Sequence, residues 1–272
     1  MTKTAIKQDF LKEQPKYSKE EHDRWKRLVE SQMEVLPDRA FQPFMEGLEQ
    51  LGILAGQIPK FEEVNKILSE KTGWTLVGVT GLVPNDMFFE QLAGRQFPVT
   101  CTLRSEEEFD YIEAPDIFHD MFGHVPLLIN PIFAEYMESY GKAGLRVEGN
   151  ELYQEYLARL YWYTVEFGLI ETNDGLRIYG SGIVSSRSES IYALSQKPHM
   201  VKFDLERVMR TEKVTSQMQE IYFVVSSMDE FIEVTNHNFS QIYQNIRAMP
   251  EIPFGFIHKN IDTVVQKGTI TV

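Results

Sequence analysis

The chain has 272 residues and a formal net charge of −13, with 43% hydrophobic and 25% charged residues. This composition is typical of a globular protein with a substantial core, and it excludes a disordered chain. No stretch approaches the roughly 20 apolar residues of a membrane helix, and an acidic chain without a Lys/Arg cluster excludes nucleic acid as the expected partner. The charged N-terminus has no signal-peptide pattern, so we expect a cytoplasmic protein without a membrane partner.

The first half of the chain is predicted to consist of helices separated by turns. Residues 18–21 fit a capping box, and Trp25 begins a helically spaced apolar series behind it. Residues 37–38 are expected to start a second helix that Gly52 ends, and a third helix is expected to stop near Gly73.

Short β-prone runs alternate with helices in the rest of the chain. Residues 74–79 and 97–103 are predicted strands separated by a Pro-Asn-Asp turn at residues 84–86. Further predictions are helices over residues 132–142 and 151–168, a strand over 176–179 after a turn at 172–175, and a strand or buried helix over 219–225. The pattern predicts a mainly α (α+β) fold, a single compact helical domain with small β elements over residues 1–272, with residues 1–20 as an N-terminal arm.

Two of the six histidines lie five residues apart, at His119 and His124, in an apolar neighbourhood. On an unbroken α-helix this spacing separates them by about 140°, so they would not share a face. Gly123 can end the helix in a left-handed turn and Pro126 forbids its continuation, which would allow both imidazoles to converge on one ion. Two unrelated core histidines are the alternative, although uncompensated imidazoles in apolar surroundings are costly.

A third metal ligand is best sought in the helix over residues 151–168. Glu166 is the only acidic residue of an apolar and aromatic run, and Trp162 precedes it by one helical turn. A carboxylate there is expected to be metal-bound or, with similar weight, paired with an arginine. Because the chain lacks H-E-x-x-H, H-x-[DE] and E-x-x-H patterns, a zinc-protease helix, a jelly-roll oxygenase and a di-iron bundle are excluded. Two histidines and one carboxylate with open positions suit Fe(II) and O₂ chemistry.

Three long strings carry a resemblance to a known family. PDIFHDMFGHVPLL, YWYTVEFGL and YGSGIVSSRSE together resemble the tetrahydropterin-dependent aromatic amino acid hydroxylases, most closely the bacterial phenylalanine 4-monooxygenase branch. The resemblance runs from about Trp25 to residues 253–262. It implies a monooxygenase that converts L-phenylalanine to L-tyrosine with O₂, using Fe(2+) and a tetrahydropterin that supplies two electrons. The chemistry then belongs to metal and cofactor, so no catalytic side chain is expected beyond the metal ligands.

The resemblance also implies roles for individual residues. The implied iron ligands are His119, His124 and Glu166. The implied substrate contacts are Arg104, which would grip the carboxylate, with Tyr111, Ile112, Trp162, Gly182 and Ser185. The implied pterin contacts are Gly81, Leu82, Phe88, Asp120, Ala158 and Tyr161.

A few positions depart from the family pattern. Ala114 stands where a glutamate is usual, so a supporting ion pair is expected to be missing, and Pro98 replaces a histidine near the pterin. Thr215 lies in a region linked to substrate choice, and the lack of an aspartate there disfavours tyrosine as substrate. The segment Gly180–Ser185 resembles a dinucleotide fingerprint but lacks its third glycine and a flanking βαβ unit, so NAD is not expected.

Alternative functions are the same reaction on tryptophan or tyrosine, another mononuclear metalloenzyme such as a zinc hydrolase with the same ligands, and a non-catalytic helical interaction domain. The expected partners are small molecules only, namely the amino acid, the pterin and O₂. A monomer or a homodimer is expected, because no heptad repeat follows the core. The lone cysteine, Cys101, excludes an internal disulfide.

Overall fold

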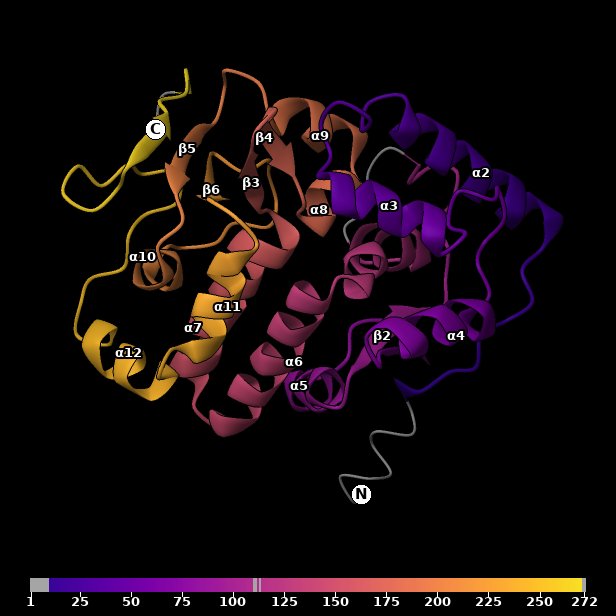
Figure 1. Ribbon diagram of the computed structural model, residues 1–272, viewed down its shortest axis with the longest axis horizontal. Coiled ribbons are helices and arrows are strands. Elements are labelled where there is room, and N and C mark those ends of the chain that lie inside the picture. Colours follow the sequence, from indigo (N-terminus) through magenta and orange to yellow (C-terminus); the bar gives the residue numbers. More distant parts are fainter. Residues whose placement is uncertain (1–9, 110–111, 113, 271–272) are drawn as a thin grey trace.

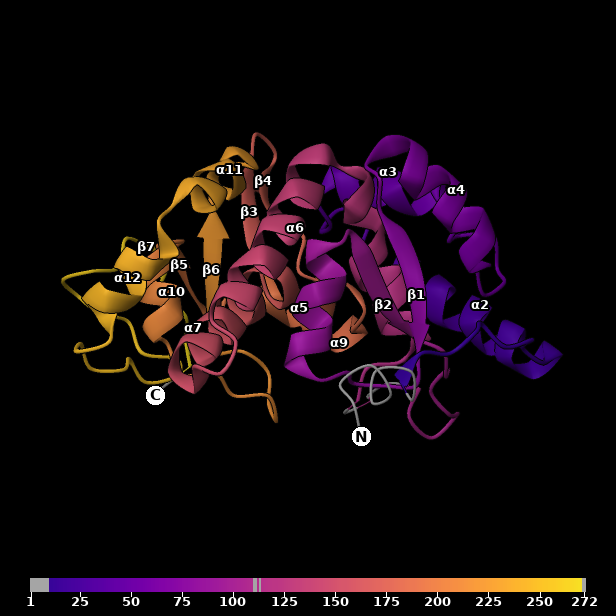
Figure 2. The ribbon, with the colours of Figure 1, turned by 90° about the horizontal axis from the view of Figure 1, so that it is seen from below.

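The structure, a computed structural model, describes residues 10–109, 112 and 114–270. Helices α6 (Pro131–Arg146) and α7 (Glu151–Tyr161) lie in the middle of the molecule, with a small sheet on either side of them (Figures 1 and 2). No helix of the described part of the chain is long and apolar enough to cross a membrane.

The N-terminal helices follow the predicted local signals, with one shift. Helix α2 (Lys19–Met33) begins with the predicted capping box, in which Ser18 Oγ accepts from the Glu21 amide and the Glu21 carboxylate accepts from the Ser18 amide. Helix α3 (Gln42–Gln50) begins later than predicted. The preceding residues bond instead to a distant strand, because the Phe41 amide donates to the Ile178 carbonyl (2.8 Å).

The first two strands are parallel, which the sequence prediction missed. Strand β1 (Thr75–Val79) pairs in register with β2 (Gln96–Thr100), and helix α5 (Asn85–Ala93) connects them. The prediction that a turn at residues 84–86 separates the two strands is wrong, because these residues begin helix α5, with Pro84 as its N-cap. Parallel strands cannot be joined by a tight turn and need a crossover, here a helix.

The second sheet has five strands in the order β4-β3-β6-β5-β7. Strand β6 is parallel to both β3 and β5, whereas β4 and β7 are antiparallel edge strands. All five residues of β6 are buried, so the strand alternative is confirmed for that run. The strands are β3 (Leu169–Thr172), β4 (Gly175–Ile178), β5 (His199–Lys202), β6 (Ile221–Val225) and β7 (Val264–Gln266).

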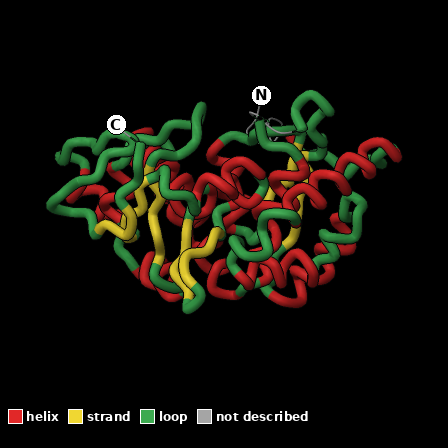
Figure 3. The backbone as a smooth tube through the Cα atoms, turned by 90° about the horizontal axis from the view of Figure 1, so that it is seen from above, coloured by secondary structure: helices red, strands yellow, loops and turns green. Residues whose placement is uncertain are grey.

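The remaining helices are short and surround the two sheets, whose strands form two separate groups in Figure 3. They are α4 (Phe61–Lys71), α8 (Ser181–Val184), α9 (Arg187–Ala193), α10 (Leu205–Arg210), α11 (Asp229–Asn236) and α12 (Phe239–Ile246).

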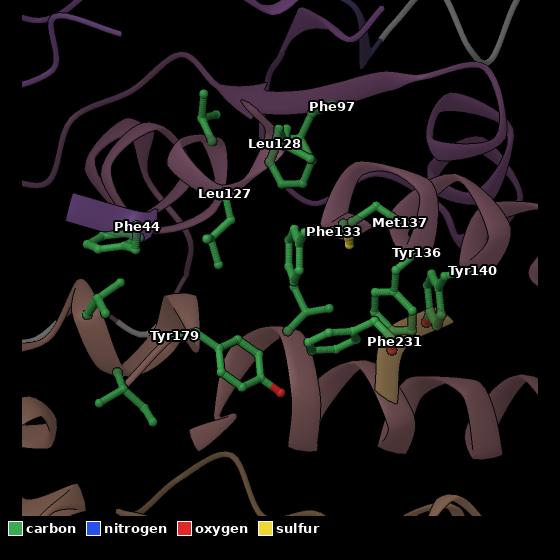
Figure 4. Close-up of a cluster of buried hydrophobic side chains, with 14 of the residues drawn as sticks. Phe44, Phe97, Leu127, Leu128, Phe133, Tyr136, Met137, Tyr140, Tyr179 and Phe231 are labelled. Atoms are coloured by element: carbon green, nitrogen blue, oxygen red, sulfur yellow. The ribbon is translucent and has the colours of Figure 1, made fainter. Parts of the chain in front are cut away.

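Aromatic side chains pack helix α11 against α6 and Tyr179. Phe231 of α11 contacts Tyr136 of α6 (ring centroids 4.7 Å apart), Phe133 (5.7 Å) and Tyr179 (5.5 Å) (Figure 4). Most of the buried hydrophobic residues form one cluster, which runs from Trp25 to Ile246 in the sequence. Aromatic pairs of this kind contribute about 0.5–1.5 kcal/mol beyond their buried area, so they stabilise the packing of α11 against α6.

Candidate metal centre

The two histidines lie on a π-helix, η1 (His119–His124), which runs into the 3₁₀-helix η2 (Val125–Ile129). The expected left-handed turn at Gly123 is wrong, because its φ is not positive and the helix continues through it. A π-helix has i→i+5 hydrogen bonds and therefore brings residues five apart onto neighbouring positions. The predicted convergence of His119 and His124 is thus achieved by widening the helix and not by ending it.

The carboxylate is presented by a second π-helix. The predicted helix over residues 151–168 is α7 followed by η3 (Trp162–Glu166), in which the Phe167 amide donates to the Trp162 carbonyl (2.9 Å). Glu166 is the last residue of η3. Both segments that carry the candidate ligands therefore leave regular α-geometry, as helices often do at functional sites.

His119, His124 and Glu166 converge, with their ligand atoms all within 4.8 Å of one another. The two Nε2 atoms are 3.0 Å apart, and the Glu166 oxygens lie 3.2 Å from His124 Nε2 and 3.6 Å from His119 Nε2. Two ligand atoms about 2.1 Å from one ion and at a right angle to each other would be about 3.0 Å apart. The spacing therefore fits three ligands on one face of an octahedral ion, and the arginine alternative for Glu166 has no support among the described residues.

The electrostatics favour the metal-binding forms of Glu166 and His119, whereas the pKa of His124 is raised, against the effect of its burial, by Glu166 and Asp120. Burial opposes ionisation of Glu166, but the adjacent imidazoles and the Ser181 hydroxyl outweigh it and lower its pKa to about 2. Burial lowers the pKa of His119 to about 4 against the attraction of Glu166. At neutral pH Glu166 is therefore ionised and His119 is neutral, which are the forms in which these two side chains bind a cation.

Two serines of one segment fix the orientation of two ligands. Ser185 Oγ donates to the Ser181 carbonyl (2.7 Å), so its contact with His119 Nδ1 (2.9 Å) must be an accepted bond. Nδ1 then carries the proton and Nε2 is left with its lone pair toward the site. Ser181 Oγ donates to Glu166 Oε2 (2.8 Å). The segment Gly180–Ser185, which resembled a nucleotide fingerprint, is thus the support of the metal centre.

Arg104 is buried and does not pair with the neighbouring surface glutamates. Its Nε and Nη2 donate to the two oxygens of Asp116, each at 2.9 Å, and it is 5% exposed. Asp116 also accepts from the His119 amide (2.9 Å), which links this pair to η1. A pocket is lined by residues of α2, by Arg104 and Ser185, and by Phe109, Phe118 and Arg187. Arg104 and Ser185, two predicted substrate contacts, therefore share one pocket.

Of the other predicted substrate contacts, Trp162 and Gly182 lie near the metal centre. Trp162 packs against Phe167 (ring centroids 4.6 Å apart), and a Cβ on Gly182 would come within 2.9 Å of the Phe167 ring. These residues therefore lie together beside Glu166. Ile112 is half-buried, and Tyr111 lies outside the described residues.

Several predicted pterin contacts gather on the His124 side of the centre. Phe88 meets Tyr161 edge-on (ring centroids 5.6 Å apart), and Tyr161 Oη is 3.5 Å from His124 Nδ1. Buried Asp120 accepts from the Thr100 amide (2.7 Å), and burial raises its pKa to about 7. Of the rest, Ala158 lies in α7 one turn before Tyr161, Gly81 follows β1, and Leu82 is 77% exposed.

Sequence reasoning missed residues whose partners are distant in the chain. Asp116, Ser181 and Gln219 bond to Arg104, Glu166 and Trp162, respectively. Asp116 lies in the string PDIFHDMFGHVPLL and Ser181 in YGSGIVSSRSE, so their place in the family-like strings was the signal that could have identified them. Gln219 lies outside those strings, and nothing in its local sequence indicated a role.

Comparison with known proteins identifies the family to which the chain is similar. Residues 6–271 match the family model described as biopterin-dependent aromatic amino acid hydroxylase. A phenylalanine-4-hydroxylase of Ralstonia nicotianae is 45% identical over 268 residues, covering 97% of this chain and 85% of the relative. One of Chromobacterium violaceum is 50% identical over 238 residues, covering 86% and 80%.

Solved structures agree with the fold. The Chromobacterium violaceum phenylalanine hydroxylase with bound Fe(III) superposes with a TM-score of 0.91 at 47% identity, covering 94% of both chains. The same enzyme with iron(III) and 7,8-dihydrobiopterin gives a TM-score of 0.89 at 47% identity, covering 94% of this chain and 93% of that one. The predicted mainly α fold with small β elements is confirmed, and the chain belongs to the biopterin-dependent aromatic amino acid hydroxylase family.

Proposed function

We propose that this protein hydroxylates L-phenylalanine to L-tyrosine with O₂ and a tetrahydropterin, using iron bound by His119, His124 and Glu166. The observation that carries the proposal is the convergence of these three side chains within 4.8 Å. Two relatives that this chain covers over 85% and 80% of their length are phenylalanine-4-hydroxylases, and the enzyme of Chromobacterium violaceum has been solved with iron and phenylalanine.

The chain's own residues orient the ligands and bind the reactants. Iron would supply the activation of O₂, and the pterin the two electrons that the reaction needs. Ser185 keeps the proton of His119 on Nδ1, and Ser181 holds the Glu166 carboxylate. Such second contacts decide whether three side chains form a ready metal site or must rearrange when the ion binds.

We assign the substrate carboxylate to Arg104. Asp116 occupies Nε and Nη2 of Arg104, and no partner of Nη1 is seen among the described residues. Nη1 can therefore donate to a carboxylate in the pocket that Ser185 also lines. We assign the aromatic side of the substrate site to Trp162, Gly182 and the segment around Tyr111 and Ile112.

We assign the pterin to the side of the centre where Phe88 and Tyr161 meet. A flat ring stacks well on an aromatic side chain, and Phe88 is half-buried. Buried Asp120 supplies a polar group there. The same assignment includes Gly81, Leu82 and Ala158.

Metal analysis combined with turnover tests the proposal. In His119→Ala and Glu166→Ala, iron content and tyrosine formation should both be lost, whereas the control His237→Ala, at an exposed position, should keep both. Assays with phenylalanine, tyrosine and tryptophan in parallel identify the substrate. Full activity of a metal-free variant, or activity that depends on zinc and not on the pterin, would contradict the proposal.

Three further expectations belong to the proposal. Residues 1–272 form one domain with residues 1–20 as its arm, the protein is a monomer or a homodimer, and its location is the cytoplasm. Limited proteolysis, light scattering of the purified protein and fractionation of expressing cells measure these properties in turn.

A further inference from the structure

A buried glutamine holds the indole of Trp162 from outside the metal centre. Trp162 Nε1 donates to Gln219 Oε1 at 3.1 Å. Gln219 is 1% exposed and is the second-last residue of the loop of residues 211–220, which connects α10 to β6. The contact therefore spans 57 residues of sequence and joins that loop to η3.

The orientation of the Gln219 amide is determined by its other partners. Its Nε2 donates to the Val214 carbonyl (3.1 Å) and to the Gln217 carbonyl (3.4 Å). Because carbonyl oxygens only accept, the NH₂ group must face them and Oε1 must face Trp162. The bonds of Nε2 therefore orient Oε1 as the acceptor for the Trp162 indole.

The backbone of Gln219 is anchored to the segment that supports the metal ligands. Its amide donates to Glu189 Oε1 (3.3 Å), which also accepts from the Tyr222 hydroxyl. Glu189 is 6% exposed and lies four residues after Ser185. One stretch of chain, through α8 and α9, therefore contributes to both sites. Ser185 contacts His119, and Glu189 holds the backbone of Gln219, whose side chain bonds to the Trp162 indole.

We propose that Gln219 is a positioning residue for the aromatic substrate, because it fixes the plane of the Trp162 indole that faces the substrate ring. This inference rests on the proposed function and on the place of Trp162 in the substrate site. The indole has a single polar hydrogen, so one hydrogen bond selects one rotation of the ring. Without it, Trp162 is held by apolar packing, on Phe167 and on the core, which does not select the direction of its N–H group.

Replacement of the amide by an apolar side chain of similar length tests the role. In Gln219→Met, the KM for phenylalanine should rise about fivefold, as expected for one lost hydrogen bond, while the KM for the pterin stays unchanged. The matched control is Gln217→Met, because Gln217 is an exposed glutamine of the same loop. Should Gln219→Met fail to fold, Gln219→Asn keeps an amide in the loop but shortens its reach, and the same shift in KM is expected.

A double-mutant cycle separates positioning from a general structural role. If Gln219 acts through the indole, Gln219→Met should change the KM for phenylalanine by less than about 1.5-fold in a Trp162→Phe background. An additive effect in that background would overturn the proposal. An unchanged KM for phenylalanine in Gln219→Met and in Gln219→Asn would also overturn it.

Tryptophan fluorescence gives a readout that does not require turnover. Trp25 and Trp74 are fully buried, so quenching of the iron-loaded protein by acrylamide reports on half-buried Trp162. Quenching should increase at least twofold in Gln219→Met and remain unchanged in Gln217→Met. Unchanged quenching in Gln219→Met overturns the inference. Absence of phenylalanine hydroxylation in the wild-type protein would instead contradict the proposed function, whatever the quenching shows.

Discussion

Ser185 shows how one hydroxyl can decide the state of a metal ligand. It accepts from His119 Nδ1 because its own proton is given to the Ser181 carbonyl. In Ser185→Ala, His119 loses this orientation, and the affinity for iron should fall about 10- to 100-fold. Titration against a competing chelator measures the affinity.

The control for this prediction is Ser188→Ala, at an exposed serine three residues further along. Its iron affinity should equal that of the wild-type protein. Equal affinities for Ser185→Ala and Ser188→Ala would mean that packing alone orients His119.

At the scale of elements, the π-helix η1 depends on the close approach of α8. A Cβ added at Gly123 would lie 2.9 Å from the Ser181 carbonyl oxygen, which is backbone and cannot turn away. In Gly123→Ala the two elements must separate, and the free energy of unfolding should fall by about 1–3 kcal/mol. Urea unfolding measures the loss.

Gly94→Ala is the matched control for Gly123→Ala. A Cβ at Gly94 would meet only ordinary contacts, the nearest at 3.4 Å, and its φ of −93° suits alanine. Its stability should match that of the wild-type protein or exceed it slightly. Iron affinity should fall in Gly123→Ala alone, because only that change moves η1 against Ser181.

The edge strand β7 is attached next to a histidine that must stay neutral. The Gly268 amide donates to His199 Nδ1 (2.8 Å), and His199 is 6% exposed. Burial lowers the pKa of His199, and Lys267 adds to the effect against Glu220. The unfolded chain therefore binds the proton more readily, so stability should fall as the pH drops below about 6.5.

Unfolding midpoints at pH 7.5 and pH 5.5 test this dependence on His199. The decrease toward pH 5.5 should be smaller in His199→Asn than in the wild-type protein, because asparagine does not titrate. The same decrease in both proteins would place the pH dependence at other groups.

At the scale of the whole molecule, a buried ion pair fastens the C-terminal segment to the core. Arg207 Nε donates to Asp262 Oδ1 (2.7 Å), and both side chains are at most 1% exposed. Asp262→Ala leaves the guanidinium buried without its charge partner, and the free energy of unfolding should fall by about 3–5 kcal/mol. Chemical unfolding followed by circular dichroism measures it.

The control for Asp262→Ala is an ion pair at the surface. Glu171 pairs with Lys202, but its side chain is 50% exposed. Glu171→Ala should therefore cost no more than about 1 kcal/mol. Similar losses in the two variants would show that burial does not set the strength of the Arg207–Asp262 pair.

Short-range patterns in the sequence determined much of the fold and the identity of the site. The capping box at Ser18 and the apolar stripe of α7 depend on residues within one or two turns, so they could be predicted. The ordered strings around His119 and Glu166 carried the family resemblance. They also singled out the three side chains that converge.

Only the tertiary structure decided how those side chains meet and what holds them. The late start of α3, the crossover through α5 and the support of Trp162 by Gln219 all depend on hydrogen bonds between distant residues. The π-helical turns were likewise not predicted from the sequence, and η1 lies so close to α8 that Gly123 has no room for a Cβ beside the Ser181 carbonyl. Local sequence cannot encode such partners, since each exists only once the chain has folded.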